Sequence, residues 1–130
     1  MLELIYETHS ISEDNEHGIA SGWLPGKLSA RGRELAVELG RRHRDDNLAA
    51  VFVSDLQRAV ETAHIAFAGS GLPLRQDVRL RECDYGELNG SPVAVLAEQR
   101  RAPHPRSLCL PSSVGSTLTS LSQEVRAIGR

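Results

Sequence analysis

The stretch Ala49-Ala50-Val51-Phe52-Val53-Ser54-Asp55-Leu56-Gln57-Arg58-Ala59 decides the fold. Residues 49–53 are apolar without interruption, which is typical of a strand buried on both faces in the middle of a parallel sheet. Ser54 and Asp55 follow, and either side chain suits the cap of a helix. We expect that helix to continue to about Ala68, with its apolar residues on one face. A buried strand followed directly by an amphipathic helix indicates an α/β protein.

The segments on either side extend the same alternation. Residues 2–7 predict a short strand, and Ser29 caps a predicted helix over 29–44. Residues 73–80 predict another short strand, so the order is β-α-β-α-β with right-handed crossovers. Residues 8–28 are rich in glycine and polar groups and predict a long loop, a feature that in a compact domain more often binds something than merely connects. The predicted fold class is therefore α/β with a mostly parallel sheet.

The composition excludes several classes of function. The chain has 130 residues, the size of one domain, and its 40% hydrophobic and 25% charged residues are close to average usage. A net charge of -2 gives no general attraction to nucleic acid or to anionic membranes. No apolar run approaches the roughly 20 residues that span a bilayer, and the N-terminus lacks the pattern of a signal peptide. Cys83 and Cys109 are too few for a disulfide framework or a cysteine-based metal site, so we expect a cytoplasmic protein without metal.

The candidate site residues follow the predicted strands. In an open α/β sheet, binding sites form beyond the carboxyl ends of the strands, which is where His9 and Ser54 lie. Arg58 is expected one turn into the next helix, on the same side as its N-terminus, where a guanidinium and the N-terminal backbone amides can hold an anion together. A neutral imidazole beside that anion is a nucleophile toward phosphorus. Glu82 has the chemistry to protonate the departing oxygen if burial raises its pKa.

Each of these residues also has an ordinary structural interpretation. A histidine at the end of a strand is more often hydrogen-bonded within the fold, and Arg58 could pair with Glu61 or Glu34 on the helix surface. Glu82 could be a turn carboxylate that faces water, and Trp23 could attach the long loop to the core. The candidates therefore gain weight only when they are taken together.

Three motifs in a fixed order carry a resemblance to a known family. The first comprises Thr8-His9-Ser10, Asn15, Gly22-Trp23 and Leu28-Ser29-Ala30-Arg31-Gly32. The second, Ser54 to Ala63, matches Ser-Asp-Leu-x-Arg-Ala-x-x-Thr-Ala in full, and the third, Leu80 to Gly90, matches Leu-Arg-Glu-x-Asp-Tyr-Gly-x-x-x-Gly. Through these motifs residues 2–92 resemble the histidine phosphatase superfamily, the phosphoglycerate mutase-like proteins.

The resemblance implies a three-layer α/β/α fold and a double displacement through phosphohistidine. It makes His9 the phosphorylated nucleophile and Glu82 the general acid, while Arg58 and Asn15 bind the substrate phosphate. Such a mechanism rests on positioning and on charge stabilisation and uses no metal. The sequence has no glycine-rich nucleotide-binding loop, so we also expect no cofactor.

Two departures from the family pattern bear on activity. The opening motif of the family is Arg-His-Gly, whereas here Thr8 and Ser10 flank His9. Their hydroxyls can donate hydrogen bonds to a phosphate, but a lost guanidinium removes a charge-assisted contact of roughly 1.5–3 kcal/mol. The second pocket histidine of the family has no counterpart, because His104 lies between prolines that oppose both strand and helix.

The tail, residues 93–130, diverges from the family pattern, although we interpret residues 1–130 as a single domain. Its Arg-, Pro- and Ser-rich character over residues 102–122 has two explanations, a shifted reading frame or a naturally shortened family member. Residues 107–123 contain no apolar run for the late strand of the family. The apolar spacing suggests instead a closing helix through Leu118, Leu121, Val125 and Ile128. We therefore expect a sheet that is incomplete at its C-terminal end, with an uncovered edge that favours a homodimer.

Two classes of function remain. The first is a phosphatase-like hydrolase that acts on a small phosphomonoester through phosphohistidine, with weakened activity. Mutase activity is disfavoured, because the chain has no room for the long segments that hold a bisphosphate. The alternative is a degenerate or truncated scaffold that binds an anion or a partner subunit, and a distinct biosynthetic role for the Thr8-His9-Ser10 variant is a third option. None of these involves nucleic acid or a membrane.

Overall fold

The central sheet has four strands. The computed structural model describes residues 2–101 and 124–129, the latter by their backbone. The strands, in spatial order, are β1 (Glu3–Thr8), β6 (Glu124–Gly129), β3 (Leu48–Val53) and β4 (Leu74–Gln76). β3 and β4 are parallel, and β6 runs antiparallel to both of its neighbours, β1 and β3. Three strands therefore point the same way, which confirms the predicted α/β class with a mostly parallel sheet.

The strand β6 corrects the prediction for the end of the chain. Val125 and Ile128, expected in a closing helix, lie in this strand, while Leu118 and Leu121 fall outside the described residues. The backbone of β6 pairs with β1 on one side and with β3 on the other, for example Glu3 with Gly129. A strand between β1 and β3 pairs with the backbone groups that each of them turns toward it, and a helix in this place would leave those groups unpaired. The late strand thus exists, but it runs opposite to β1 and β3.

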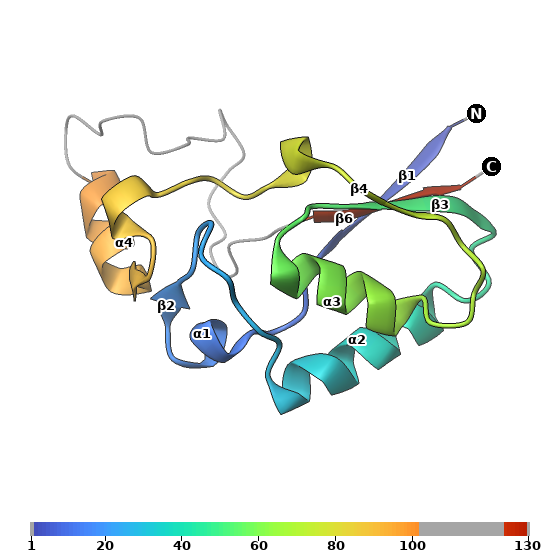
Figure 1. Cartoon of the computed structure of the whole chain (residues 1–130), viewed down its shortest axis with the longest axis horizontal. Coiled ribbons are helices and arrows are strands. Elements are labelled where there is room, and N and C mark those ends of the chain that lie inside the picture. Colours follow the sequence, from blue (N-terminus) through green and yellow to red (C-terminus); the bar gives the residue numbers. More distant parts are fainter. Residues whose placement is uncertain (1, 102–123, 130) are drawn as a thin grey trace.

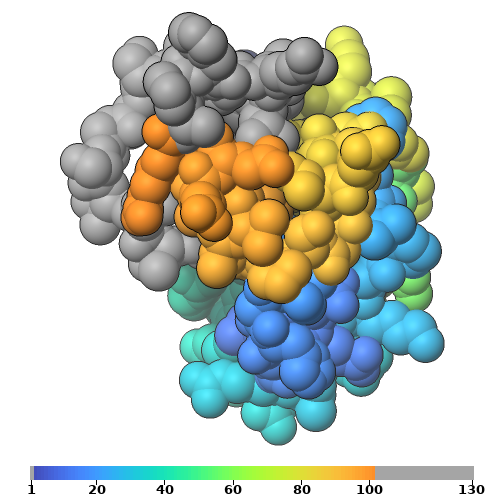
Figure 2. Space-filling view, turned by 90° about the vertical axis from the view of Figure 1, so that its left-hand side faces the viewer, coloured from blue at the N-terminus to red at the C-terminus, as the bar shows by residue number. Residues whose placement is uncertain are grey.

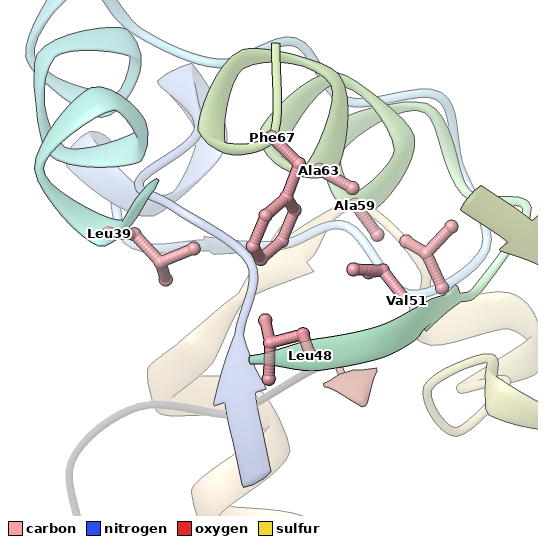
Figure 3. Close-up of a cluster of buried hydrophobic side chains, with 7 residues drawn as sticks. Leu39, Leu48, Val51, Ala59, Ala63 and Phe67 are labelled. Atoms are coloured by element: carbon pink, nitrogen blue, oxygen red, sulfur yellow. The ribbon is translucent and has the colours of Figure 1, made fainter. Parts of the chain in front are cut away.

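Two helices lie on the same side of the sheet (Figure 1): α2 (Ala30–Arg42) and α3 (Gln57–Ala66). Their buried side chains and those of β3 form the main hydrophobic cluster, shown in Figure 3, which consists of Leu39, Leu48, Val51, Val53, Ala59, Ala63 and Phe67. The alternation of buried and more exposed residues along β3 directs Val51 and Val53 toward the helices. This cluster fixes the orientation of α3, and with it the position of the site at the start of that helix.

The two helices start differently. Ser29 caps α2 as predicted, because its side chain accepts a hydrogen bond from the backbone N–H of Gly32. The prediction that Ser54 or Asp55 caps α3 is wrong, since the capping position is Leu56 and it provides no side-chain hydrogen bond. The carboxylate of Asp55 instead binds Arg81. Ser54 is fully buried, and its hydroxyl has no hydrogen-bond partner within the described part of the chain.

α2 and α3 approach each other closely at Gly40. A Cβ atom on Gly40 would lie 1.9 Å from the backbone oxygen of Ala66, which is far inside van der Waals contact. A similar approach occurs at Gly32, where a Cβ atom would lie 1.9 Å from the backbone oxygen of Ile11. The glycines in α2 therefore serve packing, although glycine weakens a helix by about 1 kcal/mol relative to alanine.

A smaller layer stands beside the sheet. The loop predicted over residues 8–28 contains a one-turn helix, α1 (Glu13–Glu16), and a short strand, β2 (Ile19–Ala20), so it is more ordered than expected. β2 pairs with β5 (Ser91–Pro92), which leads directly into α4 (Val93–Arg101). In Figure 2, α4 and the segment before it lie against the segment that contains α1 and β2. A second cluster forms here from Ala20, Tyr85 and Leu96.

Two short 3-10 helices, η1 (Val78–Leu80) and η2 (Gly86–Leu88), flank the segment that carries Glu82. They connect the edge strand β4 to the smaller layer, so the third motif bridges the two parts of the molecule (Figure 1). Among the helices of residues 2–101, none has the length and apolar character needed to cross a membrane.

Candidate active site

His9 lies immediately after β1 and is fixed through both ring nitrogens. Its Nδ1 atom is 2.6 Å from the backbone oxygen of Ser10, and because a carbonyl only accepts, Nδ1 carries the proton. The Nε2 atom then has a lone pair, which accepts a hydrogen bond from Nε of Arg58 at 3.3 Å. Burial lowers the pKa of His9 to about 4, the Ser10 carbonyl raises it in part, and the charge of Arg58 lowers it further. His9 is therefore a neutral imidazole at pH 7.

Arg58 occupies the first turn of α3 and is almost fully buried. Its guanidinium donates to the backbone oxygen of Gly22 at 2.8 Å and to that of Leu24 at 3.3 Å. It also donates to Oε2 of Glu82 at 3.0 Å. The ordinary interpretation, an arginine on the helix surface that pairs with Glu61 or Glu34, does not hold, since Arg58 is buried and its guanidinium binds Glu82. Arg58 is thus a buried cation between the imidazole and the carboxylate.

Glu82 completes the group. Its Oε1 atom accepts a short hydrogen bond from the hydroxyl of Tyr85, and its Oε2 atom binds Arg58. Burial raises the pKa of Glu82, although the Tyr85 hydroxyl and the Arg58 cation each act to lower it. Burial and the Glu82 charge also raise the pKa of Tyr85, so the phenol keeps its proton. A carboxyl group with a raised pKa can hold a proton closer to neutral pH than an exposed glutamate can.

The remaining predicted phosphate-binding residues take different positions. Thr8 is the last residue of β1 and is half-buried beside His9. The hydroxyl of Ser10 donates to the backbone oxygen of Gly32 at 2.6 Å, and its backbone N–H donates to Oγ1 of Thr62 at 3.0 Å. Ser10 therefore anchors the His9 turn to α2 and α3, and its donor points into the fold. This contact explains how a serine takes the place after the histidine without disturbing His9.

Asn15 belongs to α1. Its Oδ1 atom accepts hydrogen bonds from the backbone N–H and the hydroxyl of Ser12, at 3.0 and 2.8 Å, in a capping box. This use of the oxygen leaves the amide nitrogen as the atom with which Asn15 would contact a phosphate. The structure thus brings together His9, Arg58 and Glu82, while the phosphate contacts of Thr8, Ser10 and Asn15 stay predictions.

Sequence reasoning missed the part that Tyr85 and the loop carbonyls play. Tyr85 was visible in the third motif, three residues after Glu82, but spacing alone does not reveal which atom its hydroxyl reaches. The carbonyls of Gly22 and Leu24 have no side-chain signal at all, because any residue offers a backbone oxygen. Trp23, expected to attach the loop to the core, is 43% exposed and donates its indole N–H to the backbone oxygen of Glu82 at 2.7 Å.

The arrangement suits phosphoryl transfer in chemical terms. It contains a neutral imidazole with a lone pair, a guanidinium beside that lone pair, and a carboxyl group that can carry a proton. Positioning and charge stabilisation supply most of the catalysis in phosphoryl transfer, and these three groups provide both. Within residues 2–101 and 124–129, no group of three or more His, Cys, Asp or Glu side chains is arranged to hold a metal ion.

Comparison with known proteins defines the class. The sequence matches the family description "Histidine phosphatase superfamily (branch 1)" over residues 8–127. The chain therefore belongs to the histidine phosphatase superfamily, as its motifs predicted. The match continues beyond residue 92, where the resemblance in the motifs ends.

Individual relatives agree with this assignment. A 2,3-bisphosphoglycerate-dependent phosphoglycerate mutase of Streptococcus equi subsp. zooepidemicus is 33% identical over 104 residues, which cover 76% of this chain and 45% of that protein. The structure of Bacillus stearothermophilus YhfR is similar with a TM-score of 0.67 at 34% identity, over 73% of this chain and 48% of that one. A mycobacterial glucosyl-3-phosphoglycerate phosphatase in complex with VO3 has a TM-score of 0.67 at 28% identity, over 75% and 49% of the two chains. The chain spans less than half the length of these relatives.

Proposed function

We propose that this protein hydrolyses small phosphomonoesters through a phosphohistidine on His9. The observation that supports this most directly is the row of contacts from Nε2 of His9 to Nε of Arg58, at 3.3 Å, and from Nη2 of Arg58 to Oε2 of Glu82, at 3.0 Å. Nucleophile, cation and acid thus lie side by side, in a chain that belongs to a family named for histidine phosphatase chemistry.

The first half of the reaction transfers the phosphoryl group to the protein. Nε2 of His9 attacks phosphorus, a bond forms between Nε2 and phosphorus, and the bond from phosphorus to the ester oxygen breaks. Glu82 gives its proton to that departing oxygen, which leaves as an alcohol. The Nδ1–H group stays bound to the Ser10 carbonyl, so the charge that the ring gains is compensated by a fixed dipole.

The second half releases phosphate. Glu82, now a carboxylate, takes a proton from a water molecule whose oxygen forms a bond to phosphorus. The bond between phosphorus and Nε2 breaks, and His9 regains its lone pair while Glu82 regains its proton. The net reaction is a phosphomonoester plus water giving an alcohol plus inorganic phosphate.

Substrate binding would rearrange the donors of Arg58. In the structure these donors serve His9, Glu82 and two backbone oxygens. A phosphoryl group between His9 and Glu82 would take over the donors that face those two side chains, because a phosphate oxygen is a stronger acceptor than a neutral imidazole. The approach of the anion, with Arg58 turned toward it, would raise the pKa of Glu82 further and favour the protonated acid that the first step needs.

Hydrolysis of an aryl phosphate between pH 5 and 8 tests the proposal. We expect turnover by the native protein and none above background by His9→Ala. Circular dichroism at each pH checks that both proteins are folded. The matched control is His64→Ala, an exposed histidine on α3, which should retain full activity. Glu82→Gln should slow turnover by about 100-fold to 10,000-fold while still binding vanadate. Vanadate binding without turnover in the folded native protein would contradict the proposal and favour a scaffold that only binds anions.

A further inference from the structure

Arg81, the residue before Glu82, is held on two sides. Its Nε atom donates to Oδ1 of Asp55 at 2.6 Å, and its Nη2 atom makes a second, shorter hydrogen bond to Oδ2 of the same carboxylate. Its guanidinium carbon also lies 4.7 Å from the centre of the Trp23 ring. Arg81 thus links the start of α3 to the loop that carries Trp23.

Trp23 links Arg81 to the candidate active site. Its indole N–H donates to the backbone oxygen of Glu82 at 2.7 Å. Its neighbours in the chain, Gly22 and Leu24, offer the two backbone oxygens that hold the guanidinium of Arg58. A single indole therefore contacts Arg81, fixes the main chain of Glu82, and lies between the two carbonyls that orient Arg58.

We propose that Asp55, Arg81 and Trp23 form a clamp that positions Glu82 for proton transfer. None of the three side chains touches the reacting atoms in this arrangement, so all three are positioning residues. The clamp ties three separate segments together: the start of α3, the loop before α2 and the segment after η1. The inference rests on the proposed function, since it assigns the clamp to the acid of that reaction.

The geometry favours positioning over simple stability. Both partners of the Asp55–Arg81 pair are partly exposed, with side-chain exposures of 30% and 27%, and such pairs contribute little to folding because water screens them. The pair instead fixes the orientation of the Arg81 guanidinium. A planar guanidinium can bind a carboxylate through two parallel bonds and stack on an aromatic face at once, which a lysine ammonium cannot do. The rigid plane of Arg81 therefore sets the distance between Asp55 and Trp23.

The surroundings of Glu82 depend on this clamp. Among residues 2–101, the side chains that act on its carboxyl group are Tyr85 on the same segment, Arg58 on α3 and Arg100 on α4. His9 lies on the other side of Arg58. Burial is the largest influence on its pKa and raises it, against the opposing effects of Tyr85, Arg58 and Arg100. If the bond from Trp23 to the Glu82 main chain is lost, we expect the Glu82 segment to shift and its carboxyl group to be less deeply buried. The pKa of Glu82 then falls toward its ordinary value.

The test compares Arg81→Lys with Arg79→Lys. Arg79 lies two residues earlier, in η1, and makes the same bidentate contact with a carboxylate, that of Asp77, but at 85% side-chain exposure. It is therefore a matched control for the loss of an Arg–Asp fork. Two readouts are independent of turnover. The first is acrylamide quenching of the fluorescence of Trp23, the single tryptophan of the chain. The second is the titration of the Glu82 carboxyl group by carbon NMR, with the signal assigned from its loss in Glu82→Gln.

In Arg81→Lys we expect stronger quenching of Trp23 fluorescence and a titration of Glu82 at lower pH. We also expect the kcat for aryl phosphate to be about tenfold lower, and the alkaline limb of the kcat–pH profile to shift to lower pH. A small displacement of a catalytic group has effects of this size or larger. Arg79→Lys should match the native protein in every readout. Identical quenching and titration in the two variants would overturn the clamp.

The proposed function can fail separately from the clamp. If the native protein shows no turnover while quenching and the Glu82 titration still respond to Arg81→Lys alone, the clamp around Glu82 stands and the hydrolase is wrong. If turnover depends on His9 but both lysine variants have the same pH profile, the hydrolase stands and the clamp is wrong. Trp23→Phe adds a check, because it keeps an aromatic ring beside Arg81 and removes only the indole donor to Glu82, so it should also shift the Glu82 titration.

Discussion

The Nε2 atom of His9 lies 3.3 Å from the Nε atom of Arg58, and the guanidinium N–H points at the imidazole lone pair. A cation in this position excludes a proton from Nε2, since a second positive charge would face it at close range. The neighbouring Ser10 carbonyl holds the remaining proton on Nδ1. The pair therefore fixes the charge state and the tautomer of His9 before any substrate arrives.

We predict that His9 titrates far below the ordinary value for a histidine. Burial lowers its pKa to about 4 from an ordinary value of 6.5, with a further contribution from Arg58. In NMR spectra of histidine-labelled protein, one of the five imidazole signals should titrate near pH 4 and disappear in His9→Gln. His17→Gln, which changes an exposed histidine, should leave that signal in place. A spectrum in which every imidazole titrates above pH 6 would contradict the prediction.

The same shift has a consequence for stability. Between pH 4 and 6.5 the unfolded chain protonates His9 and the folded chain does not, so the unfolded state binds more protons. The contribution of His9 to the free energy of unfolding therefore rises with pH across this window. The nucleophile of the proposed reaction stays unprotonated as the pH falls through 6.5, so protonation of His9 should limit activity only near pH 4.

His43 should act in the opposite direction. It ends α2 and lies between two carboxylates, with Nε2 at 2.8 Å from Glu7 and Nδ1 at 2.6 Å from Asp46. Burial lowers the pKa of His43, but the hydrogen bonds and charges of Asp46 and Glu7 together outweigh it and raise the pKa above 6.5. The stabilisation is then fully present below pH 6.5 and is lost as the pH rises through the raised value.

We expect His43→Gln to lower the free energy of unfolding by about 1–2 kcal/mol at pH 6, the size of charged hydrogen bonds reduced by screening, and to have little effect at pH 9. Urea denaturation at the two pH values measures this difference. His64→Gln, on the exposed side of α3, serves as the control and should be neutral at both. An equal loss at pH 6 and pH 9 would show that His43 is not held as a cation.

The sequence predicted the parts of this fold that depend on local patterns. The apolar run at residues 49–53 gave the central strand, and Ser29 gave the start of α2, because capping and periodicity act over a few residues. The place of His9 after a strand and of Arg58 near the start of a helix followed in the same way. The motifs then joined both residues to Glu82, which local patterns alone would not have done.

Other features depend on contacts far apart in the chain. Asp55 resembles a helix cap in sequence, but Arg81 reaches its carboxylate from 26 residues away. Val125 and Ile128 have a spacing that also suits a helix, whereas their backbone pairs with β1 at the other end of the chain. Such pairings have no short-range signal, so periodicity favours the wrong element. The hydrogen bonds from Arg58 to the backbone oxygens of Gly22 and Leu24 could not be predicted for the same reason, because they join residues far apart in the chain.

Gly40→Ala should destabilise the protein although alanine favours helices. The added Cβ atom would lie 1.9 Å from the backbone oxygen of Ala66, and a backbone atom within a helix cannot turn aside. We expect a net loss of about 1–3 kcal/mol in urea denaturation, since overpacking outweighs a helix-propensity gain of about 1 kcal/mol. Gly26→Ala is the matched control, because its Cβ atom would have its nearest neighbours at an ordinary 3.5 Å. A Gly40 variant as stable as the native protein would show that α2 and α3 can separate at little cost.

Thr8→Arg should strengthen anion binding at the candidate site. Thr8 is the last residue of β1 and stands where the family motif has an arginine beside the histidine. A guanidinium there would add a charge-assisted contact of about 1.5–3 kcal/mol to a bound phosphate, and the dissociation constant of vanadate should fall by roughly tenfold to hundredfold. Isothermal titration calorimetry at low salt measures the change.

The variant Thr8→Gln tests whether charge or side-chain length matters, because glutamine is also long and donates hydrogen bonds but carries no charge. The gain in Thr8→Arg should exceed that in Thr8→Gln and decline as salt is added, since screening weakens an ionic contact more than a neutral one. Equal vanadate affinity in the two variants would mean that position 8 does not face the anion. The presence of threonine in place of the family arginine would then not weaken anion binding. The buried guanidinium of Arg58 would remain the main source of positive charge at the site.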